Sequence, residues 1–264
     1  MLLDDAYANG PYIQGAETYP PKWQAAATAF RAGLKERAEI GVPYGATDRQ
    51  VFDFFNTQGP SNGTVIFVHG GYWKAFDPSV WSHLAAGPLA AGWSVAMPGY
   101  DLCPDVRISQ ITGQIAQAVQ AIAARTQGPI VLAGHSAGGH LVARMLDAAV
   151  LPAPVRDRIK RVAPISPVAD LAPLLQTSMN DTLGLDAAEA AAESPTLTPK
   201  PKGAAVRIWV GADERPAFLD QAAALAQAWD VPQVIVPHKH HFDVIDALDH
   251  AGSDIVRFLT GANA

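Results

Sequence analysis

The chain has 264 residues, of which 49% are hydrophobic and 17% charged, enough apolar material for one large domain and too little charge for a disordered chain. Its formal net charge of −6, without a basic cluster, excludes a protein that binds nucleic acid through the phosphates. The single cysteine, Cys103, excludes an internal disulfide and a cysteine-based metal centre.

The N-terminal stretch MLLDDAYANG carries two aspartates and no basic residue, so it is unlike a secretory signal. The apolar runs are about five residues long, far short of the roughly 20 residues that cross a bilayer. We therefore expect a soluble, cytoplasmic protein that has a small-molecule substrate and neither nucleic acid nor membrane as a partner.

The first predicted element is a helix over residues 23–40, which are alanine-rich and free of proline. Apolar or β-branched runs then predict strands at 51–55, 64–68, 93–97, 130–134, 162–166, 206–210 and 233–237. Helices are predicted between them, most clearly at 108–125 and 216–229.

Most of these strands are continuous apolar runs, which is typical of strands buried on both faces of a mostly parallel sheet. Alternation of strands and helices predicts an α/β fold with helices on both faces of a central sheet. We expect a single domain over 1–264, with an N-terminal helical segment at about 1–45. A short excursion over the strand ends is expected at about 170–203, where the alternation of predicted strands and helices is interrupted.

The residues IVLAGHSAGGHL place a G-x-S-x-G motif, Gly134 to Gly138, directly between a predicted strand and a predicted helix. In that context the small flanking residues allow a sharp turn that exposes the serine hydroxyl. A serine that merely caps a helix would not explain the glycines. Ser136 is therefore the predicted nucleophile.

A serine hydroxyl becomes a good nucleophile only when a base takes its proton and a third group orients that base. The stretch VRIWVGADERPAF supplies Asp213 and Glu214 just after a late strand. The stretch VIVPHKHHFDVIDAL supplies His238, His240 and His241 after the last strand. Nucleophile, acid and histidine thus follow one another in the order that such strand–turn–helix serine enzymes use.

The stretch TVIFVHGGYW leaves an earlier strand through two glycines and two large aromatic residues. Acyl hydrolysis develops negative charge on an oxygen, which preorganised backbone N–H groups can stabilise. Gly70 and Gly71 lack side chains that would block such an approach, and Ala137 follows the nucleophile directly. These three residues are the predicted oxyanion hole, whereas a plain turn would leave the position of the glycines unexplained.

These motifs resemble the α/β-hydrolase superfamily and, more closely, its kynurenine formamidase (arylformamidase) branch. The resemblance rests on the sequences HGGYW (69–73), PGYDLCP (98–104), GHSAGGHL (134–141), VGADERPAFLDQ (210–221) and HHFDV (240–244). Weaker similarity extends to YANG near the start and to YGATDRQVFDFF (44–55), so it covers nearly the whole chain. The resemblance implies the α/β-hydrolase fold and cofactor-independent serine chemistry.

Position by position, the resemblance implies Ser136 as nucleophile, His241 as base and Glu214 as acid. Counting three residues from Gly211 favours Glu214, and Asp213 is the alternative because aspartate is the commoner acid. The implied substrate is an arylformamide such as N-formylkynurenine, and Tyr72 is the aromatic residue expected to line its pocket.

Two other functions remain open from the sequence. One is a carboxylesterase or thioesterase for small acyl groups, which would use the same machinery. The other is a ligand-binding protein without turnover, which usually lacks a triad member. The run HKHH lacks matched carboxylates, so we expect no metal and no cofactor. Exposed aromatic residues are compatible with a homodimer.

Overall fold

The structure is a computed structural model that describes residues 3–262. Its strands are β1 (Ala38–Pro43), β2 (Val51–Phe55), β3 (Thr64–Val68), β4 (Ser94–Pro98), β5 (Ile130–His135), β6 (Ile159–Ile165), β7 (Ala205–Val206), β8 (Ile208–Gly211) and β9 (Gln233–Val236). Its helices are α1 (Tyr19–Leu34), α2 (Ala86–Ala90), α3 (Ile108–Arg125), α4 (Ala137–Arg144), α5 (Ala153–Arg156), α6 (Asn180–Leu183), α7 (Ala187–Glu193), α8 (Pro216–Trp229) and α9 (Asp254–Thr260). Short 3₁₀ turns lie between several of them.

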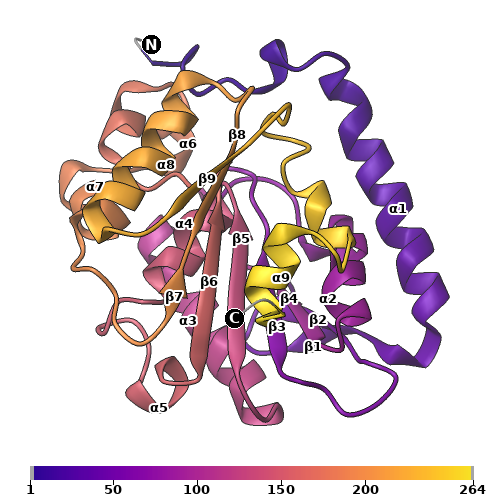
Figure 1. Cartoon of the computed structure of the whole chain (residues 1–264). Helices are drawn as coiled ribbons and strands as arrows, with labels where there is room; N and C mark the ends of the chain where they lie inside the picture. The colour runs from indigo at the N-terminus through magenta and orange to yellow at the C-terminus, as the bar shows by residue number, and fades with distance from the viewer. Residues whose placement is uncertain (1–2, 263–264) are drawn as a thin grey trace.

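Within the described residues, nine strands form one sheet in the order β1-β2-β4-β3-β5-β6-β8-β9, with β7 paired to β6. Only β2 pairs antiparallel, to β1 and to β4, and every other pairing is parallel. Helices cover both faces, with α1, α2 and α9 on one and α3, α4 and α8 on the other (Figure 1). The predicted α/β fold is confirmed.

The central strands show why their sequences are continuous apolar runs. In β3, Val65 and Phe67 pack into the core on the α1 face, whereas Ile66 and Val68 pack into the core on the α3 face. Side chains alternate across a strand, so a sheet covered on both faces needs an apolar residue at every position.

The N-terminal region differs from the prediction of one helix over 23–40. Helix α1 starts earlier, at Tyr19, and ends at Leu34, because Lys35 has a positive φ of 52° that a right-handed helix cannot continue. The following residues, Ala38–Pro43, form β1 and pair with β2 at the edge of the sheet. The sequence of a short amphipathic run beside a helix does not show whether the run forms a helix or a strand. Here the pairing with β2 makes it a strand.

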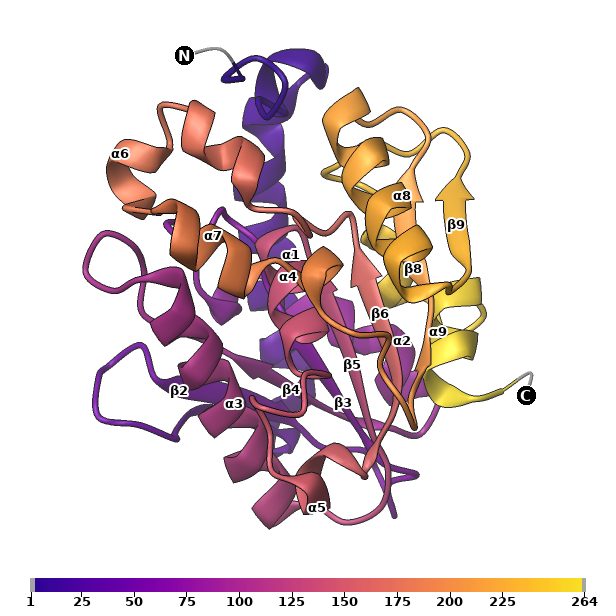
Figure 2. The ribbon, with the colours of Figure 1, turned by 90° about the vertical axis from the view of Figure 1, so that its left-hand side faces the viewer.

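The excursion at about 170–203 carries α6 and α7 between β6 and β7, and Figure 2 shows both helices beside the α3 and α4 layer. Glu193, at the end of α7, accepts hydrogen bonds from the Thr112 hydroxyl at 2.6 Å and from Arg144 Nε at 3.2 Å. These bonds join the excursion to α3 and α4.

A buried histidine on α4 predicts how stability depends on pH. His140 is fully buried, its Nε2–H donates to the Glu193 carbonyl at 2.7 Å, and burial lowers its pKa to about 4. The unfolded imidazole titrates near 6.5, so between pH 6.5 and 4 the unfolded chain binds more protons. Stability contributed by neutral His140 is therefore lost as pH falls through that window.

We expect His140→Gln, which keeps a donor for the Glu193 carbonyl, to lose less stability than the wild type between pH 7 and pH 4.5. Between these two pH values, the free energy of unfolding should fall by about 2 kcal/mol less in the variant than in the wild type. Urea unfolding at the two pH values measures it. Equal losses for both proteins would contradict the assignment.

Candidate active site

Ser136 lies on a sharp turn between β5 and α4. Its φ is +56° and its ψ −116°, a conformation that is costly for a residue with a side chain and that projects the serine out of the sheet. A Cβ on Gly134 would lie 2.1 Å from the Gly138 carbonyl oxygen, and one on Gly138 would lie 2.0 Å from the Val68 carbonyl oxygen. Both glycines of the motif are thus required for the turn to pack against β3.

His241 and Glu214 form a buried pair beside this turn. His241 Nδ1 lies 2.6 Å from Glu214 Oε2, and the two side chains are 5% and 0% exposed. Glu214 Oε1 accepts the Gly211 N–H at 2.8 Å and the Ser166 hydroxyl. With its Nδ1–H directed to the carboxylate, His241 carries its free lone pair on Nε2, as a general base must.

The competing acid and histidines lie elsewhere. Asp213 is exposed, and within the described part of the chain only its backbone N–H is engaged, donating to the Lys239 carbonyl at 2.9 Å. His240 Nε2 contacts the Tyr19 hydroxyl at 3.0 Å, and His238 is exposed. Of the two acids and three histidines considered from the sequence, the structure brings together Glu214 and His241.

The glycine loop after β3 is held in an unusual conformation. Gly71 has a φ of +112°, and a Cβ there would lie 2.4 Å from the Ala75 carbonyl oxygen. A Cβ on Gly70 would lie 2.8 Å from the His135 carbonyl oxygen, next to the turn that carries Ser136. Tyr72 and Trp73 also have positive φ values, of 49° and 54°. The loop therefore needs glycine at both positions to approach Ser136.

The three predicted oxyanion donors have free N–H groups. Gly70 and Gly71 line the same cavity as Ser136, and Ala137 begins α4 directly after it. In residues 3–262, the backbone N–H groups of these three residues donate no hydrogen bond to another part of the chain. Unpaired N–H groups at a helix start and a glycine loop can stabilise a developing oxyanion.

His69 holds the glycine loop in place. Its ring stacks on Tyr100 with 4.5 Å between ring centroids, and its Nδ1 lies 2.7 Å from the Gly70 carbonyl oxygen. His135 lines the cavity, with its ring centroid 4.6 Å from that of His241. Burial, and then the neighbouring His241, lowers the pKa of His135 well below its usual value, so it is neutral at pH 7.

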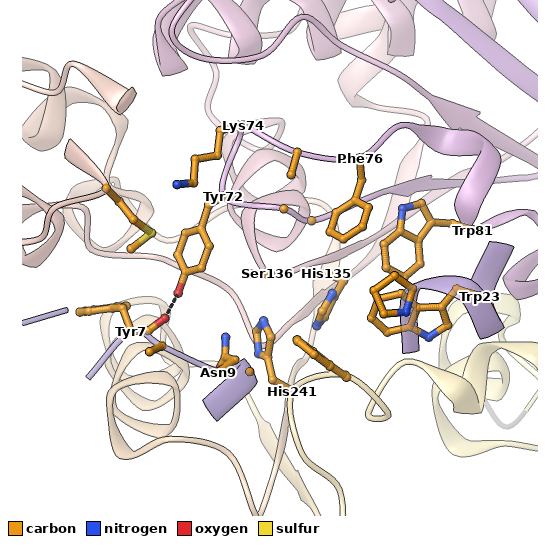
Figure 3. Close-up of a pocket in the computed structure, with 18 of the residues that line it drawn as sticks. Tyr7, Asn9, Trp23, Tyr72, Lys74, Phe76, Trp81, His135, Ser136 and His241 are labelled. Atoms are coloured by element: carbon orange, nitrogen blue, oxygen red, sulfur yellow. Dashed lines mark hydrogen bonds between the residues drawn. The ribbon is translucent and has the colours of Figure 1, made fainter. Parts of the chain in front are cut away.

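Ser136 and His241 open into a cavity of about 370 Å³ (Figure 3). One side of it is aromatic, built by Trp23 of α1, Phe76, Trp81 and Phe242. The Trp23 and Trp81 ring centroids lie 4.7 Å apart, and those of Trp23 and Phe242 lie 5.5 Å apart. Such a wall suits an aromatic or otherwise flat apolar group.

Tyr72, the aromatic residue predicted to bind substrate, lines the other side of the cavity. Its hydroxyl donates to the Tyr7 carbonyl at 2.7 Å (Figure 3). Tyr7 is fixed in turn by Gln221 Nε2, which donates to the Tyr7 hydroxyl at 2.9 Å. Trp73, the next residue, is fully buried. The excursion at about 170–203 reaches the cavity through Met179.

Comparison with known proteins places the chain in a family. Residues 65–244 match the model of a family described by the α/β-hydrolase fold. The chain belongs to this α/β-hydrolase family. Over 244 residues the hydrolase is 29% identical to kynurenine formamidase of Salmo salar, with 84% of this chain and 82% of that protein covered.

Two solved structures illustrate the range of its relatives. A protein from Silicibacter sp. TM1040, provisionally named a thioesterase, is 58% identical and superimposes with a TM-score of 0.97 over 98% of this chain and 99% of that one. Esterase B of Lactobacillus rhamnosis is 20% identical, with a TM-score of 0.67 over 92% and 91% of the two chains. At that identity the esterase supports the fold alone.

Sequence reasoning missed two parts of the hydrolase site. Ser166, fully buried at the end of β6, bonds the Glu214 carboxylate, and its only signal in the sequence was its place at a predicted strand end. The N-terminal stretch 7–11 forms a wall of the cavity although it lies far along the chain from every motif predicted to be catalytic.

None of the helices in residues 3–262 is long and apolar enough to cross a bilayer. Over the same described part of the hydrolase, no group of three or more His, Cys, Asp or Glu side chains is placed to hold a metal ion.

Proposed function

We propose that this hydrolase removes the formyl group from an arylformamide such as N-formylkynurenine. The observation that carries the proposal is the His241–Glu214 pair, 2.6 Å apart, beside the Ser136 cavity, one side of which is aromatic. The proposal is supported by the likeness to kynurenine formamidase of Salmo salar over 84% of the chain. A formyl group needs little room beside the nucleophile, which leaves the aromatic side for the aryl amine.

In the proposed reaction, Ser136 Oγ attacks the formyl carbon while His241 Nε2 accepts the hydroxyl proton. Glu214 holds the imidazole by its Nδ1–H and stabilises its positive charge. The N–H groups of Gly70, Gly71 and Ala137 stabilise the oxyanion of the tetrahedral intermediate. The C–N bond then breaks, and His241 gives its proton to the departing aryl amine.

Deacylation follows the same route with water. His241 takes a proton from water, whose oxygen attacks the formyl-enzyme ester. The tetrahedral intermediate collapses to formate, and the returned proton restores the Ser136 hydroxyl. All groups come from the chain and water, so the proposed reaction requires no cofactor.

A second candidate is a carboxylesterase or thioesterase for short acyl groups. It is favoured by the 58% identity to the Silicibacter protein provisionally named a thioesterase. A binding protein without turnover is disfavoured, because serine, histidine and acid are all present and the histidine–acid pair is formed.

The test is to compare kcat/KM for N-formylkynurenine, p-nitrophenyl acetate and acetyl-CoA under identical conditions, with Ser136→Ala as the blank. We expect the formamide to exceed the other two substrates by at least about tenfold, a difference of about 1.4 kcal/mol in transition-state binding. Equal or better turnover of the ester or the thioester would replace the formamidase proposal with the second candidate.

A further inference from the structure

The mouth of the cavity carries a cation without a counter-ion. Lys74, two residues after Tyr72, is exposed and lines the cavity with its side chain. In residues 3–262 its ammonium makes neither an ion pair nor a hydrogen bond, whereas Lys200 and Lys239 each pair with an aspartate. No Asp or Glu lies among the described residues that line the cavity. An anion entering it therefore meets an unneutralised positive charge and no carboxylate.

A second polar group in this cavity also lacks a partner. Asn9 is 8% exposed, and its Oδ1 is buried without a hydrogen bond from the described residues. Its Nδ2 donates no hydrogen bond to any residue in 3–262, and Figure 3 shows the amide directed into the cavity beside His241. Asn9 Nδ2 is not among the buried atoms, so an anion in the cavity can accept its N–H without displacing a hydrogen bond within the described residues.

The Asn9 backbone is fixed although its side chain is unpaired. Its carbonyl oxygen accepts the Tyr12 N–H at 3.0 Å, and Tyr72 bonds the nearby Tyr7 carbonyl. Arg215 holds the start of the same stretch through Asp5 Oδ2, at 2.7 Å. The amide is therefore presented by an anchored segment, as a preorganised binding group should be.

We propose that Lys74 and Asn9 form a subsite for an anionic group on the substrate, which makes this enzyme prefer substrates that carry a carboxylate or a phosphate beyond the acyl group. The inference rests on the proposed acyl-transfer chemistry at Ser136. Lys74 supplies the charge and Asn9 a neutral N–H donor. The aromatic wall holds the apolar part of the substrate, so charge and ring are recognised on different sides of the cavity.

The experiment compares an anionic substrate with a neutral counterpart in each of three pairs. The pairs are 4-acetoxybenzoate with its methyl ester, N-formylkynurenine with its carboxamide, and acetyl-CoA with the phosphate-free thioester S-acetyl-N-acetylcysteamine. For each pair, the ratio of kcat/KM for the anionic to the neutral substrate is measured in wild type, Lys74→Met, Lys74→Arg and Asn9→Leu. Lys160→Met removes an exposed lysine outside the cavity and is the matched control.

We expect Lys74→Met to lower the ratio about fivefold for at least one pair, mainly through KM, with Lys74→Arg restoring it and Lys160→Met leaving it unchanged. A fivefold change corresponds to about 1 kcal/mol, as for a partly exposed ion pair. Asn9→Leu should lower the ratio about two- to threefold, and added salt should weaken the wild-type preference. The pair with the largest effect identifies the anion as a carboxylate or a phosphate.

A ratio within twofold of wild type for Lys74→Met in every pair would overturn the subsite. Failure of the formamide pair alone, with the charge preference kept in the ester or thioester pair, would reject the formamidase proposal and support the subsite. If no pair is turned over, calorimetry measures the dissociation constants of 4-acetoxybenzoate and its methyl ester for the same variants. The ratio of these two constants in each variant then tests the subsite in place of the ratio of kcat/KM.

Discussion

Replacing Ser136 with alanine is expected to lower kcat by about four to six orders of magnitude, the loss seen when the nucleophile of a serine triad is removed. The fold should survive, because the Ser136 hydroxyl makes no hydrogen bond with the described residues and its removal leaves no buried group unpaired. Activity against p-nitrophenyl acetate and N-formylkynurenine, together with thermal unfolding, measures both effects.

A matched control separates loss of chemistry from loss of stability. Ser253 caps α9, where its hydroxyl oxygen accepts the Val256 N–H at 3.3 Å. Ser253→Ala should cost about 1 kcal/mol of stability and leave kcat within about twofold. Retention of more than about 1% of the wild-type activity by Ser136→Ala would refute the nucleophile assignment.

The second large effect is expected at the acid. Glu214→Gln should lower kcat about 10³- to 10⁴-fold, because the amide nitrogen that replaces Oε2 cannot accept the His241 Nδ1–H and a neutral amide does not stabilise the imidazolium. The glutamine carbonyl oxygen can still accept the Gly211 N–H and the Ser166 hydroxyl, which Glu214 Oε1 accepts in the wild type. The geometry of the site should therefore persist while the charge is lost.

Asp213→Asn is the control for this prediction. Asp213 is exposed and adjacent in sequence, so the variant removes one carboxylate from the same turn without touching His241. We expect its kcat to stay within about twofold of wild type. Loss of activity in Asp213→Asn together with normal activity in Glu214→Gln would reverse the assignment of the acid.

Asp213 and Glu214 show how far residue spacing along the chain can identify the acid. Both carboxylates follow β8 at the carboxyl edge of the sheet, where a triad acid is expected. The sequence favoured Glu214 only through its distance from Gly211 and a family resemblance. In the structure, the turn after β8 buries Glu214 against Ser166 and leaves Asp213 in solvent. Side-chain direction at a turn depends on the backbone angles, which sequence spacing only approximates.

By itself the sequence determined the α/β class, most strands, the helices over 108–125 and 216–229, and the strand–serine–helix turn at Ser136. These features depend on short-range sterics and on apolar periodicity, and both can be read within a window of about 20 residues. The family could also be recognised, because its motifs are such local features.

Only the tertiary structure decided how distant segments build the pocket. Tyr7 meets Gln221, Tyr19 meets His240, and Asn9 lies in the cavity of Ser136. Pairing with β2 likewise turned Ala38–Pro43 into a strand. The physical reason is the same throughout. These contacts join residues far apart in the chain, so their formation depends on how the helices and strands pack against one another, and no local pattern of side chains encodes that packing.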